Sequence, residues 1–257
     1  MDDLLNNLLD NLTNNFNDGI ISCLIDNTQM VNIDQCISCQ SNEYYNSTSI
    51  NYSCAIKKNI YMLRYMVVHI KEITSILDRI DIKHFINKPL KILSIGGGSG
   101  IDILAFNYWI NSKLDTTPEI NYTVIDKENW GNIFNIVTSM HTCNTQIHHE
   151  YISSDTQLED DYDLVIMSYL LSELDSETIE IVWNKIGNNK IIIINDRSEV
   201  KVLETMKNKR EETSSSDCEC FNKEHCRYTF PFEDKTISGL QLKIFKNSCG
   251  CIYYNDN

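Results

Sequence analysis

The sequence predicts an α/β protein: a doubly wound, seven-strand, mostly parallel sheet with a helical N-terminal extension. Three observations predict it. Apolar runs alternate with amphipathic helical patterns from residue 86 onward, which is typical of a parallel sheet covered on both faces. A glycine cluster joins the first of these runs to the first helix, and strand-like runs close the chain. We therefore expect two regions, residues 1–85 and residues 86–257.

The N-terminal region is expected to be mainly helical. Residues 2–17 repeat leucines at helical spacing, which predicts an amphipathic helix. Residues 31–56 are polar and favour irregular structure. Residues 59–81 place apolar side chains on one face of a long helix. This region would form a cysteine-bearing cap above the strand ends, where open α/β sheets bind their ligands.

The C-terminal region alternates strands and helices. Strands are expected at 91–95, 121–126, 147–153, 162–168 and 190–195. Helices are expected at 99–112, 128–140, 175–186 and 199–210. Residues 211–227 favour a loop, and runs at 238–246 and 250–254 predict an antiparallel hairpin that completes the sheet.

Composition and charge exclude several classes of protein. The 257 residues are 42% hydrophobic and 23% charged, which suits one globular core. No apolar run approaches the roughly 18 residues of a membrane span, and the acidic start is unlike a secretory signal. We expect an intracellular, cytoplasmic protein with no membrane partner. The net charge of −14 disfavours a broad nucleic-acid face, although Lys57, Lys58 and Arg64 could form a local basic groove.

Ten cysteines are more than a cytosolic enzyme of this length needs. Without an export signal, free, metal-bound or redox-active thiols are expected rather than a disulfide framework. Cys218 and Cys220 form a Cys-x-Cys pair, and Cys226 follows closely. These thiolates could hold zinc or an iron–sulfur cluster. The alternative is a set of free structural thiols in an oxidation-prone loop.

The most informative stretch is Leu93-Ser-Ile-Gly-Gly-Gly-Ser-Gly100. A strand that ends in glycines and restarts as a helix lets a ligand approach the backbone closely and presents unpaired N–H groups to it. The next strand ends in Asp126, whose carboxylate could accept hydrogen bonds from vicinal ribose hydroxyls. Alternatively, the glycines merely connect strand to helix or bind a nicotinamide or flavin nucleotide, and Asp126 caps the following helix.

With these motifs in this order, the chain resembles the class I S-adenosylmethionine-dependent methyltransferases over roughly residues 85–254. The resemblance implies S-adenosyl-L-methionine as cofactor, with Asp126 on its ribose and the segment from Asp163 to Glu173 beside the transferred methyl. Trp130 would either stack on the adenine or cover the core. The remaining cofactor residues would be the glycines beneath the methionine part and a Ser-Asp pair at the adenine amino group: Gly96, Gly97, Gly98, Gly100, Ser154, Asp155 and, at the fourth strand end, Ser168.

The segment Met167-Ser-Tyr-Leu-Leu-Ser-Glu173 limits the reaction. It lacks the prolines that often mark methyltransferases of exocyclic base amines, so a small molecule, a protein or RNA remains as acceptor. Ser168, Tyr169 and Glu173 are the catalytic candidates, with Glu173 or Tyr169 as proton acceptor. Glu173 could instead cap the next helix, and alignment alone could suffice. The segment, followed by a cysteine-rich region, is also similar to one in a ribosome-associated group of methyltransferase-like proteins.

The sequence thus predicts an enzyme that transfers a methyl group from S-adenosyl-L-methionine to an oxygen or nitrogen of an unidentified acceptor. Two alternatives stay open. One is a catalytically silent, methyltransferase-like scaffold that serves a partner subunit. The other is a nicotinamide-dependent oxidoreductase, which would use the same glycine turn for a different nucleotide.

Overall fold

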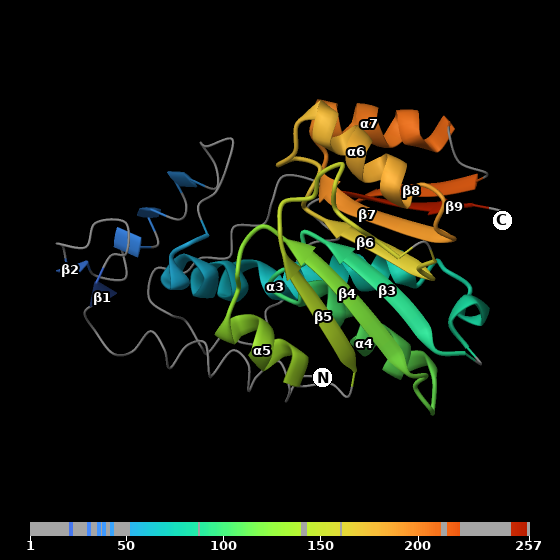
Figure 1. Cartoon of the computed structure of the whole chain (residues 1–257), viewed down its shortest axis with the longest axis horizontal. Helices are drawn as coiled ribbons and strands as arrows, with labels where there is room; N and C mark the ends of the chain where they lie inside the picture. Colours follow the sequence, from blue (N-terminus) through green and yellow to red (C-terminus); the bar gives the residue numbers. More distant parts are fainter. Residues whose placement is uncertain are drawn as a thin grey trace.

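The computed structural model describes residues 52–86, 88–139, 143–159, 161–211, 215–221 and 248–255, with short stretches between residues 21 and 43. Within them lies a seven-stranded sheet of order β5-β4-β3-β6-β7-β9-β8 (Figure 1). Its strands are β3 (Leu90–Ile95), β4 (Ile120–Asp126), β5 (Asn144–His149), β6 (Leu164–Ser168), β7 (Ile191–Arg197), β8 (Ser215–Phe221) and β9 (Ser248–Tyr254).

Five strands, β3 to β7, run parallel, and β9 pairs antiparallel with both β7 and β8. The helices are α3 (Ala55–Leu77), η1 (Ile82–Phe85), α4 (Ile101–Lys113), α5 (Asn132–Ser139), α6 (Ser176–Ile186) and α7 (Val200–Glu211). Two strands of two residues each, β1 (Ile21–Ser22) and β2 (Met30–Val31), form a separate two-stranded sheet. The seven-strand, mostly parallel α/β fold that the sequence predicts is confirmed.

Helices cover both faces of the sheet (Figure 1). One apolar cluster joins α3, α4 and α5 to one face, and a second joins α6 and α7 to the other. Successive strand residues alternate between them: Ile92 belongs to the first cluster and Leu93 to the second. This alternation follows from the two-residue period of a strand, and it explains why the central strands are continuously apolar.

α3 is part of this core. Its side chains lie in the same cluster as those of α4 and the central strands, and Ile73, Ile76 and Leu77 are fully buried. The long helix predicted at 59–81 is therefore present, beginning a turn earlier and ending at Leu77. No helix among the described residues is long and apolar enough to cross a membrane. The amphipathic helix predicted at 2–17 lies outside the described residues.

The sheet edges differ from the sequence prediction. β8 occupies residues that we expected to be a loop, and β5 begins at Asn144 rather than at 147. The reason is that edge strands have one neighbour and few buried side chains, so their sequences carry little apolar signal. β9 begins at Ser248, within the expected hairpin turn. The strand predicted at 238–246 lies outside the described residues.

The expectation of free or metal-bound thiols is wrong for Cys218, Cys249 and Cys251, which are disulfide-bonded. Cys218 of β8 forms a disulfide with Cys251, its register partner on β9, so its sulfur is not a metal ligand here. Cys220 lies in β8 but its side chain is not described, and Cys226 lies outside the described residues. Among the residues that the structure describes, no group of three His, Cys, Asp or Glu side chains could hold a metal ion.

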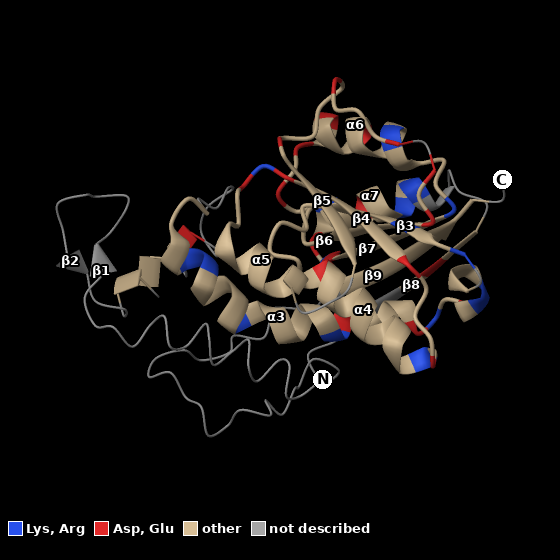
Figure 2. Cartoon of the chain, turned by 60° about the horizontal axis from the view of Figure 1, so that its bottom comes forward, with Lys and Arg blue, Asp and Glu red and all other residues tan. Residues whose placement is uncertain are grey.

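Basic residues are spread over the described elements. Figure 2 shows Lys and Arg on α3, α4, α6 and α7, with acidic residues on the same helices or on the loops between them. Two of these cations pair with acids on other elements: Lys209 contacts Glu180, and Lys113 contacts Asp78. Lys57, Lys58 and Arg64, which the sequence suggests as a local basic groove, are buried in the structure, so they do not form an exposed basic groove.

Candidate functional site

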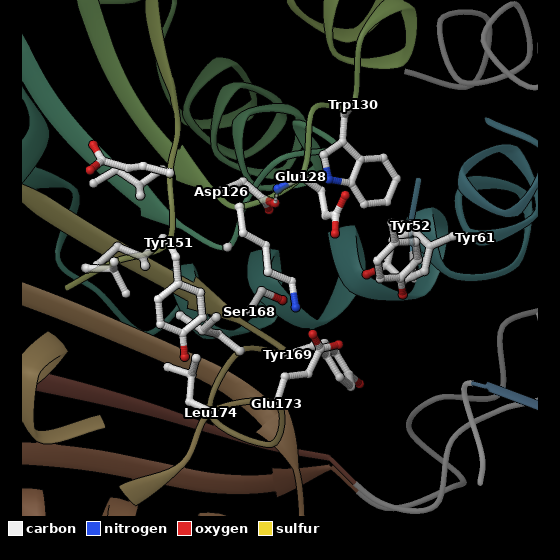
Figure 3. A pocket seen from close by; sticks show the side chains of 17 residues that line it. Tyr52, Tyr61, Asp126, Glu128, Trp130, Tyr151, Ser168, Tyr169, Glu173 and Leu174 are labelled. Carbon is white, nitrogen blue, oxygen red and sulfur yellow. Dashed lines mark hydrogen bonds between the residues drawn. The ribbon is translucent and has the colours of Figure 1, made fainter. Parts of the chain in front are cut away.

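A pocket lies at the carboxyl ends of β3, β4 and β6 (Figure 3). In the sheet, β3 has β4 as its neighbour on one side and β6 on the other, so the strand order reverses direction at β3. Open α/β sheets bind ligands at such a switch point. The hollow has about 750 Å³ of space outside the protein atoms, part of which is open to solvent. The lining comprises Tyr52, Tyr61, Ile95, Gly96, Ile125, Asp126, Lys127, Glu128, Trp130, Glu150, Tyr151, Ile152, Ser168, Tyr169, Leu170, Glu173 and Leu174.

Asp126 ends β4 at the rim of the glycine turn. Its Oδ2 accepts a hydrogen bond from Gly98 N–H at 2.9 Å, and its Oδ1 accepts one from Glu128 N–H at 2.8 Å. A carboxylate offers about four acceptor sites, so capacity remains for a ligand's hydroxyls. Burial raises the pKa of Asp126, and the two backbone hydrogen bonds oppose that rise. Because α5 begins only at Asn132, Asp126 is not the cap of that helix.

The glycine turn is shaped by close approach. A Cβ at Gly98 would lie 2.2 Å from Trp130 Cδ1 and 2.5 Å from Asp126 Cγ, so only glycine lets these side chains rest on the turn. Gly96 has φ +75° and lines the pocket itself. Gly97, Gly98 and Gly100 do not line it. Gly97 lies over the side chains of Ser94 and Asp102, and Gly100 caps α4 in the left-handed conformation.

An aromatic wall faces the glycine turn. Trp130 packs against Tyr52 and Tyr61, with ring centroids 5.2 and 5.5 Å apart. Lys58 of α3 lies over the same indole and donates a hydrogen bond to Asn129 O. The indole Nε1 is buried without a hydrogen-bond partner. Trp130 thus both covers the core and lines the pocket.

Glu173 lies across the hollow from Asp126 and is half-buried (Figure 3). Burial raises its pKa to about 7, helped by the negative charges of Asp196 and Asp126 and opposed by Lys127 and Arg197. Glu173 does not cap the next helix, because the cap of α6 is Asp175, which accepts a hydrogen bond from Thr178 N–H at 2.7 Å. A carboxylic acid that titrates near neutral pH can take up a proton during a reaction.

Ser168 and Tyr169 complete the same wall at the end of β6. Ser168 Oγ lies 3.4 Å from Asn195 Nδ2, which donates to it. Tyr169 has φ +55° and donates its hydroxyl hydrogen bond to Glu72 of α3, at 2.9 Å to Oε2. The three predicted catalytic candidates therefore share one pocket with Gly96, Asp126 and Trp130.

The predicted adenine pair lies elsewhere. Ser154 and Asp155 are exposed and do not line the pocket. The preceding residues, Glu150, Tyr151 and Ile152, line it instead. The chain bends there because Ser153, one residue later, begins a turn in which its N–H donates to Thr156 Oγ1.

Sequence reasoning missed several lining residues. Lys127 and Glu128 directly follow Asp126, so their position at the strand end was a usable signal. Tyr52 carried no such signal, because it reaches the pocket from far earlier in the chain. The same holds for Glu72, which does not line the pocket but contacts Tyr169, 97 residues later.

The residues present fit a nucleoside cofactor. A half-buried carboxylate with spare acceptor sites, an indole whose N–H has no hydrogen-bond partner and the left-handed backbone of Gly96 line one hollow. Asp126 would hold the ribose hydroxyls, and the turn at Gly96 would pass beneath the rest of the molecule.

Comparison with known proteins gives a family match. Residues 38–179 match the model of a family described as "Putative SAM-dependent methyltransferase"; SAM is S-adenosylmethionine. The plantazolicin methyltransferase BpumL, solved with S-adenosylhomocysteine (SAH), is 12% identical, and the match covers 87% of this chain and 99% of that one with a TM-score of 0.49. The precorrin-6y C5,15-methyltransferase of Geobacter metallireducens is 12% identical, with coverages of 74% and 87% and a TM-score of 0.42. No curated protein matches the chain.

The matched range is more than half of the chain, and it contains the glycine turn, Asp126 and the segment from Ser168 to Glu173. This chain therefore belongs to that family of SAM-dependent methyltransferases, and its cofactor is S-adenosyl-L-methionine.

Proposed function

We propose that this enzyme moves the methyl group of SAM to a nitrogen or oxygen that loses a proton in the reaction, and that Glu173 accepts that proton. The observation that carries the proposal is the raised pKa of Glu173, about 7, in the same pocket as Asp126. Bound SAM would supply a methyl group made electrophilic by its sulfonium. The protein then has to align the acceptor, exclude water and take up a proton.

Two further contacts support Glu173 over Tyr169 as the proton acceptor. The Tyr169 hydroxyl donates a hydrogen bond to the buried carboxylate of Glu72. That carboxylate does not line the hollow, so the hydroxyl hydrogen points away from a bound acceptor. Glu173 makes its backbone hydrogen bond to Leu170 O at 2.9 Å, which leaves its carboxylate at the pocket. Ser168 would help to orient the acceptor.

The cofactor contacts form the other half of the proposal. Asp126 would bind the ribose hydroxyls, and Gly96, Gly97, Gly98 and Gly100 would form the turn that carries the methionine part. Trp130 would border the adenosine, with its buried N–H as a donor. Tyr151 and Ile152 stand where we expected Ser154 and Asp155 at the adenine end. The acceptor would enter from the side of Tyr52, Tyr61 and Glu173.

A transfer assay tests the proposal. Tritium from [methyl-³H]SAM is followed into an extract of cells that lack the protein. We expect the transfer rate to rise with pH and level off above a half-point near 7, because the base must be ionised. Glu173→Gln should slow transfer by about 100-fold and abolish the rise of the rate around pH 7. The affinity for SAH should stay within about threefold of the wild-type value.

Two results would overturn the proposal. A wild-type chain that binds SAH but labels nothing would favour the silent scaffold. A Glu173→Gln variant with a normal rate and an unchanged pH step would remove Glu173 from the reaction. Glu177→Gln is the matched control, because Glu177 is an exposed acid in the first turn of α6 and should change neither reading.

A further inference from the structure

Behind the pocket wall, α3 contributes a buried carboxylate. Glu72 is 4% exposed. Its Oε2 accepts hydrogen bonds from Tyr169 Oη and from Asn195 Nδ2, both at 2.9 Å, and its Oε1 lies 3.2 Å from the same Tyr169 hydroxyl. Burying a carboxylate costs free energy unless hydrogen bonds compensate it. Glu72 thus connects α3 by hydrogen bonds to Tyr169, which follows β6, and to Asn195 in β7.

The residue that Glu72 contacts has an unusual backbone. Tyr169 is the one non-glycine residue with positive φ in the described part of the chain, at +55°. Such a conformation costs about 1–3 kcal/mol and persists only where the surroundings hold it. Its N–H donates to Asn195 O at 2.7 Å, and its ring stacks on His69 at 4.1 Å. Burial lowers the pKa of His69 to about 3, so the stacked imidazole is neutral.

The bend at Tyr169 determines where the following residues lie. Directly after it, Glu173 N–H donates to Leu170 O at 2.9 Å, and Ser172 N–H donates to Asp196 Oδ2 at 3.2 Å. This short turn carries Glu173 back to the hollow. If Tyr169 relaxed to an ordinary backbone conformation, the chain would leave β6 in another direction and the Glu173 carboxylate would move with it.

We propose that Glu72 is a positioning residue for methyl transfer: it holds Tyr169 in its left-handed conformation and thereby places Glu173 in the pocket. The inference rests on the proposed role of Glu173. Glu72 does not line the hollow, so it acts through Tyr169 and Asn195 and not by contact with the reacting atoms. Through Glu72, α3 would help to position the site, in addition to packing in the core.

The test compares Glu72→Gln, Tyr169→Phe and a matched control, Tyr253→Phe. Glu72→Gln removes the negative charge that strengthens the two hydrogen bonds accepted by Oε2 from Tyr169 and Asn195, and it places an amide group beside the Tyr169 hydroxyl. Tyr253 is a buried tyrosine on the opposite face, and its hydroxyl donates to Met206 O at 3.0 Å. For each protein, SAH affinity is measured by titration calorimetry, and tritium transfer from [methyl-³H]SAM is measured into the extract of cells that lack the protein.

We expect Glu72→Gln and Tyr169→Phe each to slow transfer by about 10- to 100-fold, because small misplacements have effects of that size. SAH affinity should stay within about threefold, since Asp126 and the glycine turn are untouched. In a Glu173→Gln background, Glu72→Gln should change the rate by less than about twofold, because residues that act through one another are not additive. Tyr253→Phe should transfer at the wild-type rate.

The outcomes separate the two proposals. If the wild-type chain transfers methyl groups and both Glu72→Gln and Tyr169→Phe match it, the positioning role is wrong. If Glu72→Gln slows the Glu173→Gln enzyme by as much as it slows the wild type, Glu72 does not act through Glu173, and the role is also wrong. If Glu72→Gln fails to fold, Tyr169→Phe decides by the same two criteria. A wild-type chain without any transfer refutes the proposed function itself.

Discussion

At the scale of single residues, Asp126 and Gly98 form one unit. The carboxylate accepts the Gly98 N–H, and the Trp130 indole rests on the same glycine. The backbone of the turn therefore determines where the Asp126 carboxylate and the indole lie. Glycine is needed at 98 because any side chain would occupy the space that these two residues fill.

Gly98→Ala tests this unit. The added Cβ would have to displace the Asp126 carboxylate and the Trp130 ring, so we expect SAH affinity to fall by about tenfold or more and the unfolding free energy to fall by about 1–3 kcal/mol. Calorimetric titration and urea unfolding measure the two effects.

Gly131→Ala is the matched control for that change. Gly131, unlike Gly98, has positive φ, +49°, and a Cβ there would meet nothing closer than Asn129 Oδ1 at 3.8 Å. Alanine there should cost stability through backbone strain and leave SAH affinity within about threefold. Equal losses of affinity in both variants would show that the turn acts only through general stability.

Several predicted site residues that follow a strand do line the pocket, although Ser154 and Asp155, which follow β5, do not. Gly96, Asp126, Ser168, Tyr169 and Glu173 all stand at the carboxyl ends of apolar runs, and the structure brings them to one hollow. The helical approach from α3 could not be predicted. Glu72 reads as an interruption of an amphipathic pattern, and only the folded chain shows it against a residue 97 positions later.

At the scale of elements, the central strands were predictable and the edges were not. β6 and β7 are buried on both faces, so their apolar runs fix their positions. β8 is the polar sequence Ser-Ser-Asp-Cys-Glu-Cys-Phe, and its one strand neighbour within the described residues is β9. Its place in the sheet comes from backbone hydrogen bonds and the Cys218–Cys251 disulfide, neither of which has a periodic signature.

The disulfide makes a prediction about this edge. It closes a loop with a sequence separation of 33 residues, and chain-entropy estimates for such loops are about 3–4 kcal/mol. Cys218→Ser should lower the unfolding free energy by about 2–4 kcal/mol, measured by urea unfolding without reductant. Cys143→Ser, at a free and partly buried cysteine, should change it by less than about 1 kcal/mol. Equal stability of Cys218→Ser and the wild type would argue that the bridge does not support the edge.

At the scale of the whole molecule, buried acids near the pocket make stability depend on pH. Asp102 is 3% exposed, and its Oδ2 accepts a hydrogen bond from Ser94 Oγ at 2.6 Å. Burial raises its pKa to about 6, opposed by the Ser94 hydrogen bond and assisted by the charge of Asp126. In the unfolded chain the same group has a pKa near 3.8.

The sign follows from proton binding. Between about pH 4 and 6 the folded state holds the proton on Asp102 more tightly than the unfolded state does, so this group's stabilisation is lost as pH rises through about 6. The difference between the two pKa values corresponds to about 3 kcal/mol. The unfolding free energy of the wild type minus that of Asp102→Asn should therefore fall by about that amount between about pH 4 and pH 7. A difference that stays constant with pH would mean that the pKa of Asp102 is not raised in the fold.

The central claim is that SAM binds at the carboxyl ends of β3 and β4 with its ribose on Asp126. The most direct measurement is calorimetric titration of SAH into the wild type and into Asp126→Ala, with NADH as a second ligand. We predict that SAH binds the wild type, that Asp126→Ala weakens binding by about tenfold or more while the protein stays folded, and that NADH does not bind. Undiminished SAH affinity in Asp126→Ala, or binding of NADH in place of SAH, would contradict the account.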